Sequence, residues 1–294
     1  MKTMVRFLTR HLYLLAVAGG AASFALGLRL GWPLEAVVLG WSLLVLAAGI
    51  VLERVAPFDA TWRQTRGDTA TDATSAALLI GVVDPLLKAA LPVAVIALLG
   101  DRAAGWWPQD GPLALQIAAA ILWIELAKYT MHRLHHERPL LWQLHALHHG
   151  SERLYWLNNF RFHPLNHLFN TAASLLPLWL LGAPEVVLLG ATALTQPVLM
   201  LQHANVDLAS GWLDRLLSTN AVHRWHHSTQ PHEANANYGS ALLLWDHVFG
   251  TYRVPAGRGR PERIGLFGDG RGFPARASYW RQLIGAWQPA CCRS

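Results

Sequence analysis

Charged side chains are scarce in this sequence. Of its 294 residues, 14% are charged and 53% are apolar, whereas an ordinary soluble chain has about 25% charged residues. Cysteine is scarcer still, because only Cys291 and Cys292 are present, adjacent to each other near the end of the chain. The lack of charge argues against a soluble protein, and the lack of cysteine excludes a disulfide scaffold and a cysteine-bound iron–sulfur cluster.

The apolar residues form long runs. A helix needs about 20 apolar residues to cross the hydrocarbon core of a bilayer, and four runs qualify, namely 12–30, 33–52, 74–99 and 113–131. A fifth run, 171–201, contains a Leu-Gly-Ala-Pro turn sequence and is expected to form a hairpin of two short helices. These runs predict an all-α fold, a polytopic bundle of membrane helices.

Positive charge in the connecting segments predicts the orientation of the bundle. Residues 1–10 and 53–72 carry three basic residues each, whereas 100–112 carry one. Since Lys and Arg collect on the cytoplasmic side, the first two segments are expected in the cytoplasm, and the chain returns there at His132. A cleaved signal peptide begins in a similar way, but the length of the first run and the span that follows it favour a retained helix.

The net charge of +6 fits contact with anionic lipid head groups. No basic stripe interleaved with aromatic residues indicates nucleic acid as a partner. Tryptophan favours membrane interfaces, so Trp142 and Trp156 are expected in the cytoplasmic aromatic belt.

Histidine is concentrated in one part of the chain, because 14 of the 15 histidines lie between His132 and His247. Three histidine boxes repeat one spacing, with histidines three and four residues after the first. The boxes are His132-His135-His136, His145-His148-His149 and His223-His226-His227. On a helix these positions share one face, so each box can direct two or three ring nitrogens at one point. Imidazole binds iron, copper, nickel and zinc.

The number of histidines favours two metal ions. With His203 the boxes offer up to ten ligands, and one ion accepts about six. The first box continues the 113–131 run, so the site is expected at the cytoplasmic interface, within reach of a lipid chain. Glu125 lies two helical turns before His132, and because metal-bound histidines commonly donate their second N–H to a carboxylate, Glu125 is a candidate partner.

Longer motifs resemble those of the fatty acid hydroxylase/sterol desaturase superfamily over roughly residues 113–253. The motifs are Glu125-x3-Tyr129-x2-His132-Arg133-x2-His136, Leu141-Trp142-x2-His145-x2-His148-His149, Arg161-Phe162-His163-Pro164, Gln202-His203-x-Asn205, His223-Arg224-x-His226-His227, Asn237-Tyr238-Gly239 and Trp245-Asp246-x2-Phe249-Gly250-Thr251-Tyr252. One histidine box alone is weak evidence, whereas three in order, after membrane spans, are specific.

The resemblance implies a non-haem centre of two iron ions that activates O2 and oxidises a lipid C–H bond, with no catalytic group beyond the metal centre. The ligands that it implies are His132, His136, His145, His148, His149, His203, His223, His226 and His227. Candidates for either a ligand or a supporting role are His163, His135, Glu125 and Asn237. Two positions depart from the family pattern, because His135 is an additional histidine and Asn166 stands where a glutamate often follows the His-Pro pair.

The expected organisation has three parts. Residues 1–112 form N-terminal transmembrane helices, residues 113–254 form the catalytic domain, which includes the 171–201 hairpin, and residues 255–294 form a tail. A helical cap at the cytoplasmic face carries the di-metal site, and in a bacterium the protein would reside in the cytoplasmic membrane.

Lipid oxidation explains why a metal is needed, because an aliphatic C–H bond offers neither an acidic proton nor an electrophilic carbon. Hydroxylation and desaturation both remain open, as do fatty acyl chains, sterols, ether lipids and aminolipids as substrates. Each turnover needs two electrons. The sequence shows no haem-binding motif and no dinucleotide-binding glycine motif, so a separate donor of the ferredoxin or cytochrome type, with a reductase, is predicted.

Two other functions are compatible with clustered histidines. A zinc-dependent lipid hydrolase would use three ligands and a catalytic carboxylate, and a metal transporter or store would place ionisable residues along its spans. The surplus of histidine and the few ionisable residues in the spans favour the oxygenase.

Overall fold

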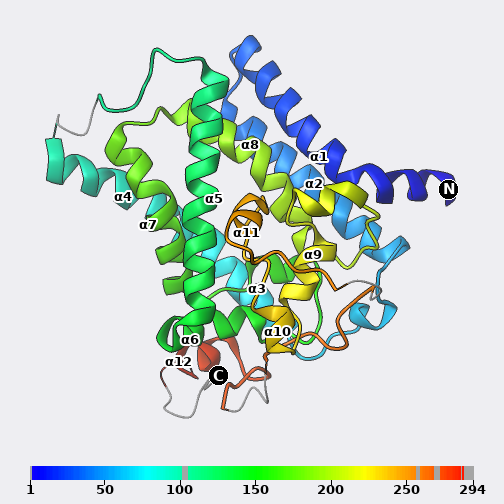
Figure 1. Cartoon of the computed structure of the whole chain (residues 1–294). Coiled ribbons are helices and arrows are strands. Elements are labelled where there is room, and N and C mark those ends of the chain that lie inside the picture. Colours follow the sequence, from blue (N-terminus) through cyan, green and yellow to red (C-terminus); the bar gives the residue numbers. More distant parts are fainter. Residues whose placement is uncertain (1, 101–104, 256–258, 268–271, 286, 288–294) are drawn as a thin grey trace.

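The computed structural model describes residues 2–100, 105–255, 259–267, 272–285 and 287, and Cys291 and Cys292 lie outside these residues. The described part of the chain is helical, with isolated β-bridges and no strand (Figure 1). The predicted all-α membrane bundle is therefore confirmed.

Five helical segments among the described residues are long and apolar enough to cross a membrane. The helices that form them are α1 (Lys2–Leu30), α2 (Leu34–Val55), α3 (Thr69–Leu78) with a π-helical turn (Leu79–Val83) and α4 (Asp84–Leu99), α5 (Leu113–Glu137) and α8 (Glu185–Gln202). The first four contain the four predicted spans. Large apolar side chains on their outer faces are exposed, for example Leu39 and Leu44 of α2, which is favourable when the surrounding solvent is lipid.

The predicted hairpin is also confirmed. It consists of α7 (Pro164–Leu181) and α8, which are joined by the predicted Leu-Gly-Ala-Pro turn. Gly182 adopts a left-handed conformation with φ 78°, and its N–H bonds to the end of α7, a common helix ending. Helix α8 lies at the centre of the bundle, and a Cβ on Gly20 of α1 would lie 2.2 Å from the carbonyl oxygen of Ala193. Glycine is thus required for the close approach of α1 to α8.

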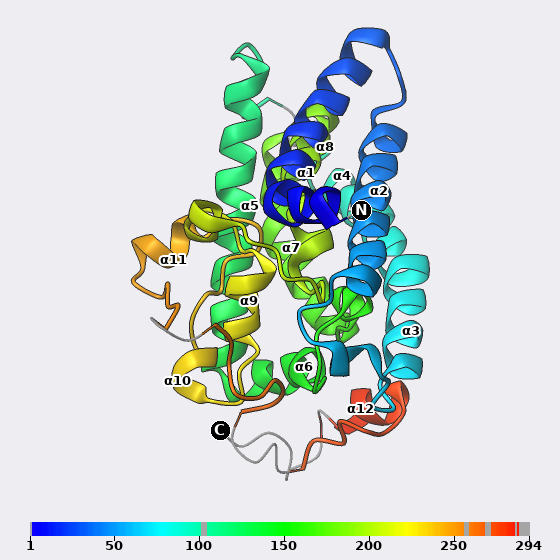
Figure 2. The same ribbon diagram turned by 90° about the vertical axis from the view of Figure 1, so that its right-hand side faces the viewer.

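Short helices pack beside the long ones, and several of them form a cap at one end of the bundle. They are α6 (Pro139–His149), α9 (Asn220–His226), α10 (Pro231–Ala234), α11 (Leu244–Val248) and α12 (Tyr279–Gly285), with 3-10 turns at Ala60–Arg63, Trp156–Phe160 and Gly211–Arg215. In both views α6, α10 and α12 lie at the end where α5 finishes, opposite the turn between α1 and α2, whereas α9 and α11 lie beside α5 nearer to its middle (Figure 1 and Figure 2). We call this end of the molecule the histidine end.

Two ion pairs tie the cap to the start of α3. The Arg153 guanidinium pairs with Asp68 at 2.7 Å, and the Arg161 guanidinium pairs with Asp72 at 2.8 Å. All four side chains are buried. Because removing one partner of a buried pair leaves an uncompensated charge, these pairs fix the position of the cap relative to the membrane helices.

Candidate metal centre

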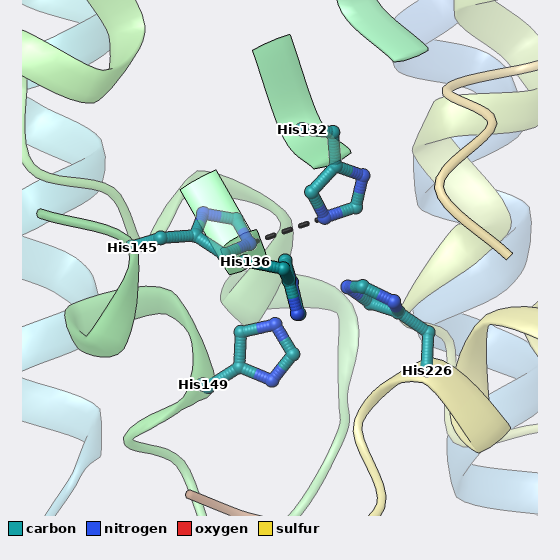
Figure 3. A group of neighbouring side chains, drawn as sticks. All are labelled: His132, His136, His145, His149 and His226. Carbon is teal, nitrogen blue, oxygen red and sulfur yellow. Dashed lines mark hydrogen bonds between the residues drawn. The ribbon is translucent and has the colours of Figure 1, made fainter. Parts of the chain in front are cut away.

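Nine histidines from three helices and one helix end come together at the histidine end. They form two groups, and within each group one ring nitrogen from every histidine lies within 4.8 Å of the others. Group one consists of His132, His136, His145, His149 and His226 (Figure 3). Group two consists of His148, His203, His223 and His227. The structure thus brings together all nine residues that the sequence predicts as ligands.

Each histidine box directs two of its ring nitrogens to one group, within the two or three that the spacing predicted, and in the second and third boxes the remaining histidine belongs to the other group. In the second box, on α6, His145 and His149 lie in group one and His148 lies in group two. The third box, on α9, has the opposite arrangement, with His223 and His227 in group two and His226 in group one. The reason is geometric. The second and third histidines of a box are consecutive residues, so they point about 100° apart around the helix axis. Helices α6 and α9 each lie between the two groups.

Oxygen acceptors hold five of these rings by their Nδ1 atoms. The contacts are His132 to the Tyr238 carbonyl at 2.9 Å, His136 to Asn235 Oδ1 at 3.1 Å, His145 to Asn166 Oδ1 at 2.8 Å, His148 to the Arg161 carbonyl at 3.1 Å and His226 to the Ala236 carbonyl at 2.9 Å. An oxygen acceptor requires a proton on Nδ1, so in the neutral ring Nε2 carries a free lone pair. This is the arrangement that metal-binding histidines commonly show.

The nitrogen atoms that face the centre of each group fit a bound cation. In group one, Nε2 of His132 lies 3.1 Å from Nε2 of His145 (Figure 3). With both protons on Nδ1, these two atoms have no hydrogen to share, and their lone pairs repel unless a cation lies between them. Nε2 of His136 and of His226 are buried and have no hydrogen-bond partner among the described residues, which is costly in the absence of a ligand.

Group two also brings ring nitrogens close together, and His148 is its member whose Nδ1 contacts an oxygen acceptor. Nε2 of His223 lies 2.9 Å from that of His203 and 3.1 Å from that of His227, and all three rings are buried. Burial lowers the pKa of His203 to about 3. Burial, followed by the neighbouring histidines, also holds the pKa of other rings well below 6.5, as it does for His145, His148, His149, His223, His226 and His227. The imidazoles are therefore neutral at pH 7, the state that binds metal ions.

The two other candidate histidines lie outside both groups. His135 is fully buried on α5, and its Nδ1 donates to the Met131 carbonyl at 2.6 Å, one turn back along the same helix. His163 caps the start of α7, where its Nδ1 accepts the backbone N–H of Leu165 at 3.1 Å. Burial lowers the pKa of His163 to about 4. Both rings have local structural partners instead of a place in a nitrogen cluster.

Glu125 and Asn237 shape the loop beside group one. Oε2 of Glu125 accepts the backbone N–H groups of Ala241 and Leu242 at 2.8 and 2.7 Å, so its hydrogen bonds go to this loop and not to a histidine. The side chain of Asn237 exchanges two hydrogen bonds with the backbone of Arg253. Asn237 has a φ of 57°, and its two chain neighbours supply the carbonyl groups that hold His226 and His132.

Three residues near the histidines have roles that the sequence did not predict. Asn166, noted only as a departure from a family pattern, accepts from His145, and Asn235 accepts from His136. Nothing in the sequence around Asn235 signals this contact. The preference of tryptophan for interfaces predicted that Trp142 lies in the cytoplasmic aromatic belt, and this is wrong. Trp142 is buried, with its ring 5.2 Å from His136 and 5.3 Å from His149, because α6 turns that face towards the histidines.

A helical membrane bundle that carries clustered, metal-competent histidines at one end defines a class of membrane proteins, and comparison with known sequences identifies the family. A sequence model described as fatty acid hydroxylase matches residues 117–251, the segment that holds all nine histidines. The chain is 38% identical to an ornithine lipid hydroxylase of Rhizobium tropici over 233 residues, which is 77% of this chain and 70% of that protein. The chain belongs to the fatty acid hydroxylase family, as the motif resemblance predicted.

More distant relatives share only part of their length with this chain. Alkylglycerol monooxygenases of Danio rerio and Homo sapiens are both 31% identical to it, over 155 and 149 residues. These matches cover 52% and 50% of this chain, but only 31% and 32% of those enzymes. No solved structure shows significant similarity to the chain.

Proposed function

We propose that this protein is a membrane-bound oxygenase that holds two iron ions, one in each histidine group, and hydroxylates an aliphatic C–H position of a membrane lipid. The observation that carries the proposal is the pair of adjacent clusters of neutral imidazoles, five in group one and four in group two. The names of the relatives, a lipid hydroxylase and monooxygenases, support hydroxylation over desaturation. O2 is the co-substrate, and a separate carrier supplies two electrons.

The residues of this chain would orient and isolate the reaction. Asn166, Asn235 and the carbonyl groups of Ala236 and Tyr238 hold four rings of group one in the tautomer that leaves Nε2 free. Trp142, stacked on Phe267 with ring centroids 4.1 Å apart, lies against His136 and His149 of group one and would exclude water. When bound, the two irons supply the O2-dependent oxidant that an unactivated C–H bond requires.

Two features argue against the alternatives. Neither metal group contains an Asp or Glu, whereas a zinc hydrolase needs a catalytic carboxylate beside an open coordination position. A transporter needs an ion pathway, but Glu125, the acidic residue of α5 that precedes the first box, is engaged with the loop at Ala241 and Leu242.

The substrate and the orientation of the protein are part of the proposal. We expect an aminolipid of the ornithine lipid type to be the first substrate to test, because the relative with that name aligns with most of the chain. The charge of the loops supports a histidine end that faces the cytoplasm, where soluble electron carriers are available. Residues 113–254 would then form the catalytic unit, and residues 1–112 would anchor it.

The decisive experiment combines metal analysis with lipid profiling. Protein purified after expression under iron-replete, reducing conditions should contain close to two irons per chain, and lipid extracts of a host that carries the gene should gain a hydroxylated lipid. Full activity with zinc as the only metal would refute the oxygenase. Zinc found after overexpression alone would not, because zinc outcompetes ferrous iron at imidazole sites.

A further inference from the structure

A wide groove opens at the histidine end, between the segment that joins α2 to α3, the end of α6 and the segment that precedes α12. Its volume is about 1140 Å³. Its walls come from segments that are far apart in the sequence, within 59–66, 150–152, 229–231, 260–266 and 273–277. The groove lies outside both histidine groups, and neither the oxidation of a lipid nor the binding of the metals uses it.

Two residues that line the groove lie within two positions of metal-group histidines. Gly150 comes directly after His149, and Thr229 lies two residues after His227. Gly265, which also lines the groove, is hydrogen-bonded to the same segment, because its N–H donates to the His227 carbonyl at 3.0 Å. The rings of His149 and His227, one from each group, are stacked at 4.4 Å. The groove is therefore connected to both metal groups by short stretches of backbone.

An apolar layer separates the groove from the histidine rings. Leu266 and Phe273 line the groove and pack in the same core as Trp142. Trp142 in turn contacts His136 and His149 in group one. Such a layer blocks water and small polar molecules from the groove to the metals, but it does not block electron transfer through packed aromatic side chains.

The charge of the groove is positive. Four arginines line it, Arg66, Arg260, Arg263 and Arg276, against three carboxylates, Asp59, Glu152 and Glu262. Arg66 and Arg276 share the single partner Glu152, at 3.7 and 3.1 Å, and Arg276 is 79% exposed. Arg263 has no ion-pair partner among the residues that the structure describes. This arrangement leaves guanidinium groups available to carboxylates of a partner.

We propose that this groove is the docking site of an acidic one-electron carrier protein, an inference that rests on the proposed oxygenase function. One turnover consumes the lipid R–H, O2, two electrons from two reduced carrier molecules and two protons from water, and it gives R–OH and one H2O. The lipid approaches from the bilayer, so the carrier must bind at another face, and the groove is the solvent-facing feature that shares backbone with both groups. Small interfaces with charge complementarity are typical of transient electron-transfer partners.

Binding of a known acidic carrier tests the docking site directly. The probe is a plant-type [2Fe–2S] ferredoxin, titrated against the full-length protein in lipid nanodiscs. We expect binding that weakens steeply with ionic strength, and a loss of affinity of about tenfold in the R263E/R276E variant. The matched control is R138E, because Arg138 is an exposed residue at the start of α6 that does not line the groove. The affinity of this variant for ferredoxin should be unchanged. E262K, which adds positive charge to the groove, should bind more tightly.

A chemical reductant separates this proposal from the proposed function. With dithionite in place of the carrier, the wild type and all variants should oxidise lipid equally, whereas ferredoxin-driven turnover should fall only in R263E/R276E. Failure of the wild type to oxidise any lipid with dithionite would remove the proposed function. The docking site would be overturned if ferredoxin did not bind, or if it bound R263E/R276E as tightly as the wild type. Displacement of bound ferredoxin by phosphatidylglycerol vesicles but not by salt would also overturn it. Iron content and gel filtration would confirm that each variant is folded.

Discussion

His148 and His149 are adjacent in the chain, yet their rings stand at 83° to each other with centroids 5.6 Å apart, and each belongs to a different metal group. His226 and His227 repeat the arrangement at 89° and 5.5 Å. Each of the two boxes thus contributes to both groups, with the first and last histidines in one and the middle histidine in the other. The two groups share α6 and α9, so a shift of either helix would disturb both.

This division predicts that neighbouring substitutions empty different sites. H148A should lose about one of two irons, from group two, and H149A should lose about one iron from group one, since each removes a nitrogen donor. Both should abolish oxidation. Mössbauer spectra of the two variants should then show different remaining irons. His11 lies on α1, where its ring contacts Phe7, and H11A is the control with both irons retained. Identical spectra for H148A and H149A would contradict the division.

The additional histidine of the first box should be dispensable for metal binding. His135 lies outside both groups and bonds to the Met131 carbonyl, so H135A should keep both irons and roughly half or more of its activity, less than the 10–100-fold loss expected for a residue that supports a ligand. Iron analysis and lipid turnover would check this. A folded H135A protein with one iron would show that the first box is assigned wrongly.

Asn166 should support His145 by its oxygen atom. N166A removes the acceptor 2.8 Å from His145 Nδ1, and loss of such a partner typically costs about 10–100-fold in metal affinity or activity. N166D keeps an acceptor and should retain most of the affinity. N170A, one turn further along α7 where the side-chain oxygen has no partner among the described residues, is the control. If metal titration gave N166A the same metal affinity as N170A, the supporting role of Asn166 would be excluded.

The metal-free protein should lose stability as the pH falls. Burial lowers the pKa of His203 to about 3 and holds that of His148 and His223 well below 6.5, while the same rings titrate near 6.5 in the unfolded chain. Between these values the unfolded state binds more protons, so the free energy of unfolding decreases by about 1.4 kcal/mol per pH unit for each such histidine. This contribution is complete above pH 6.5 and is lost progressively below it. Thermal unfolding of the metal-free protein in detergent between pH 8 and 5 would measure it, and a midpoint independent of pH would contradict neutral, buried rings.

Loop charge predicts that the histidine end faces the cytoplasm. A reporter fused after Ser294 should behave as cytoplasmic, and one inserted near Gln109 should behave as periplasmic or external. The opposite result would reverse the orientation and would also remove soluble cytoplasmic carriers as electron donors.

The sequence by itself determined the membrane bundle, because segments with almost no charge can be stable only in lipid and because Gly182 and the proline after it end one helix and begin the next. The spacing of its histidines offered ten candidate ligands, and the family motifs that the sequence carries implied the nine that meet in the two groups. Only the tertiary structure decided how they divide. Residues three and four positions along a helix point in different directions, and what lies in each direction depends on how α5, α6 and α9 pack. The same holds for Asn235, 99 residues away from His136 in the chain, and for Trp142, because no local pattern specifies a contact that exists only after distant helices have packed.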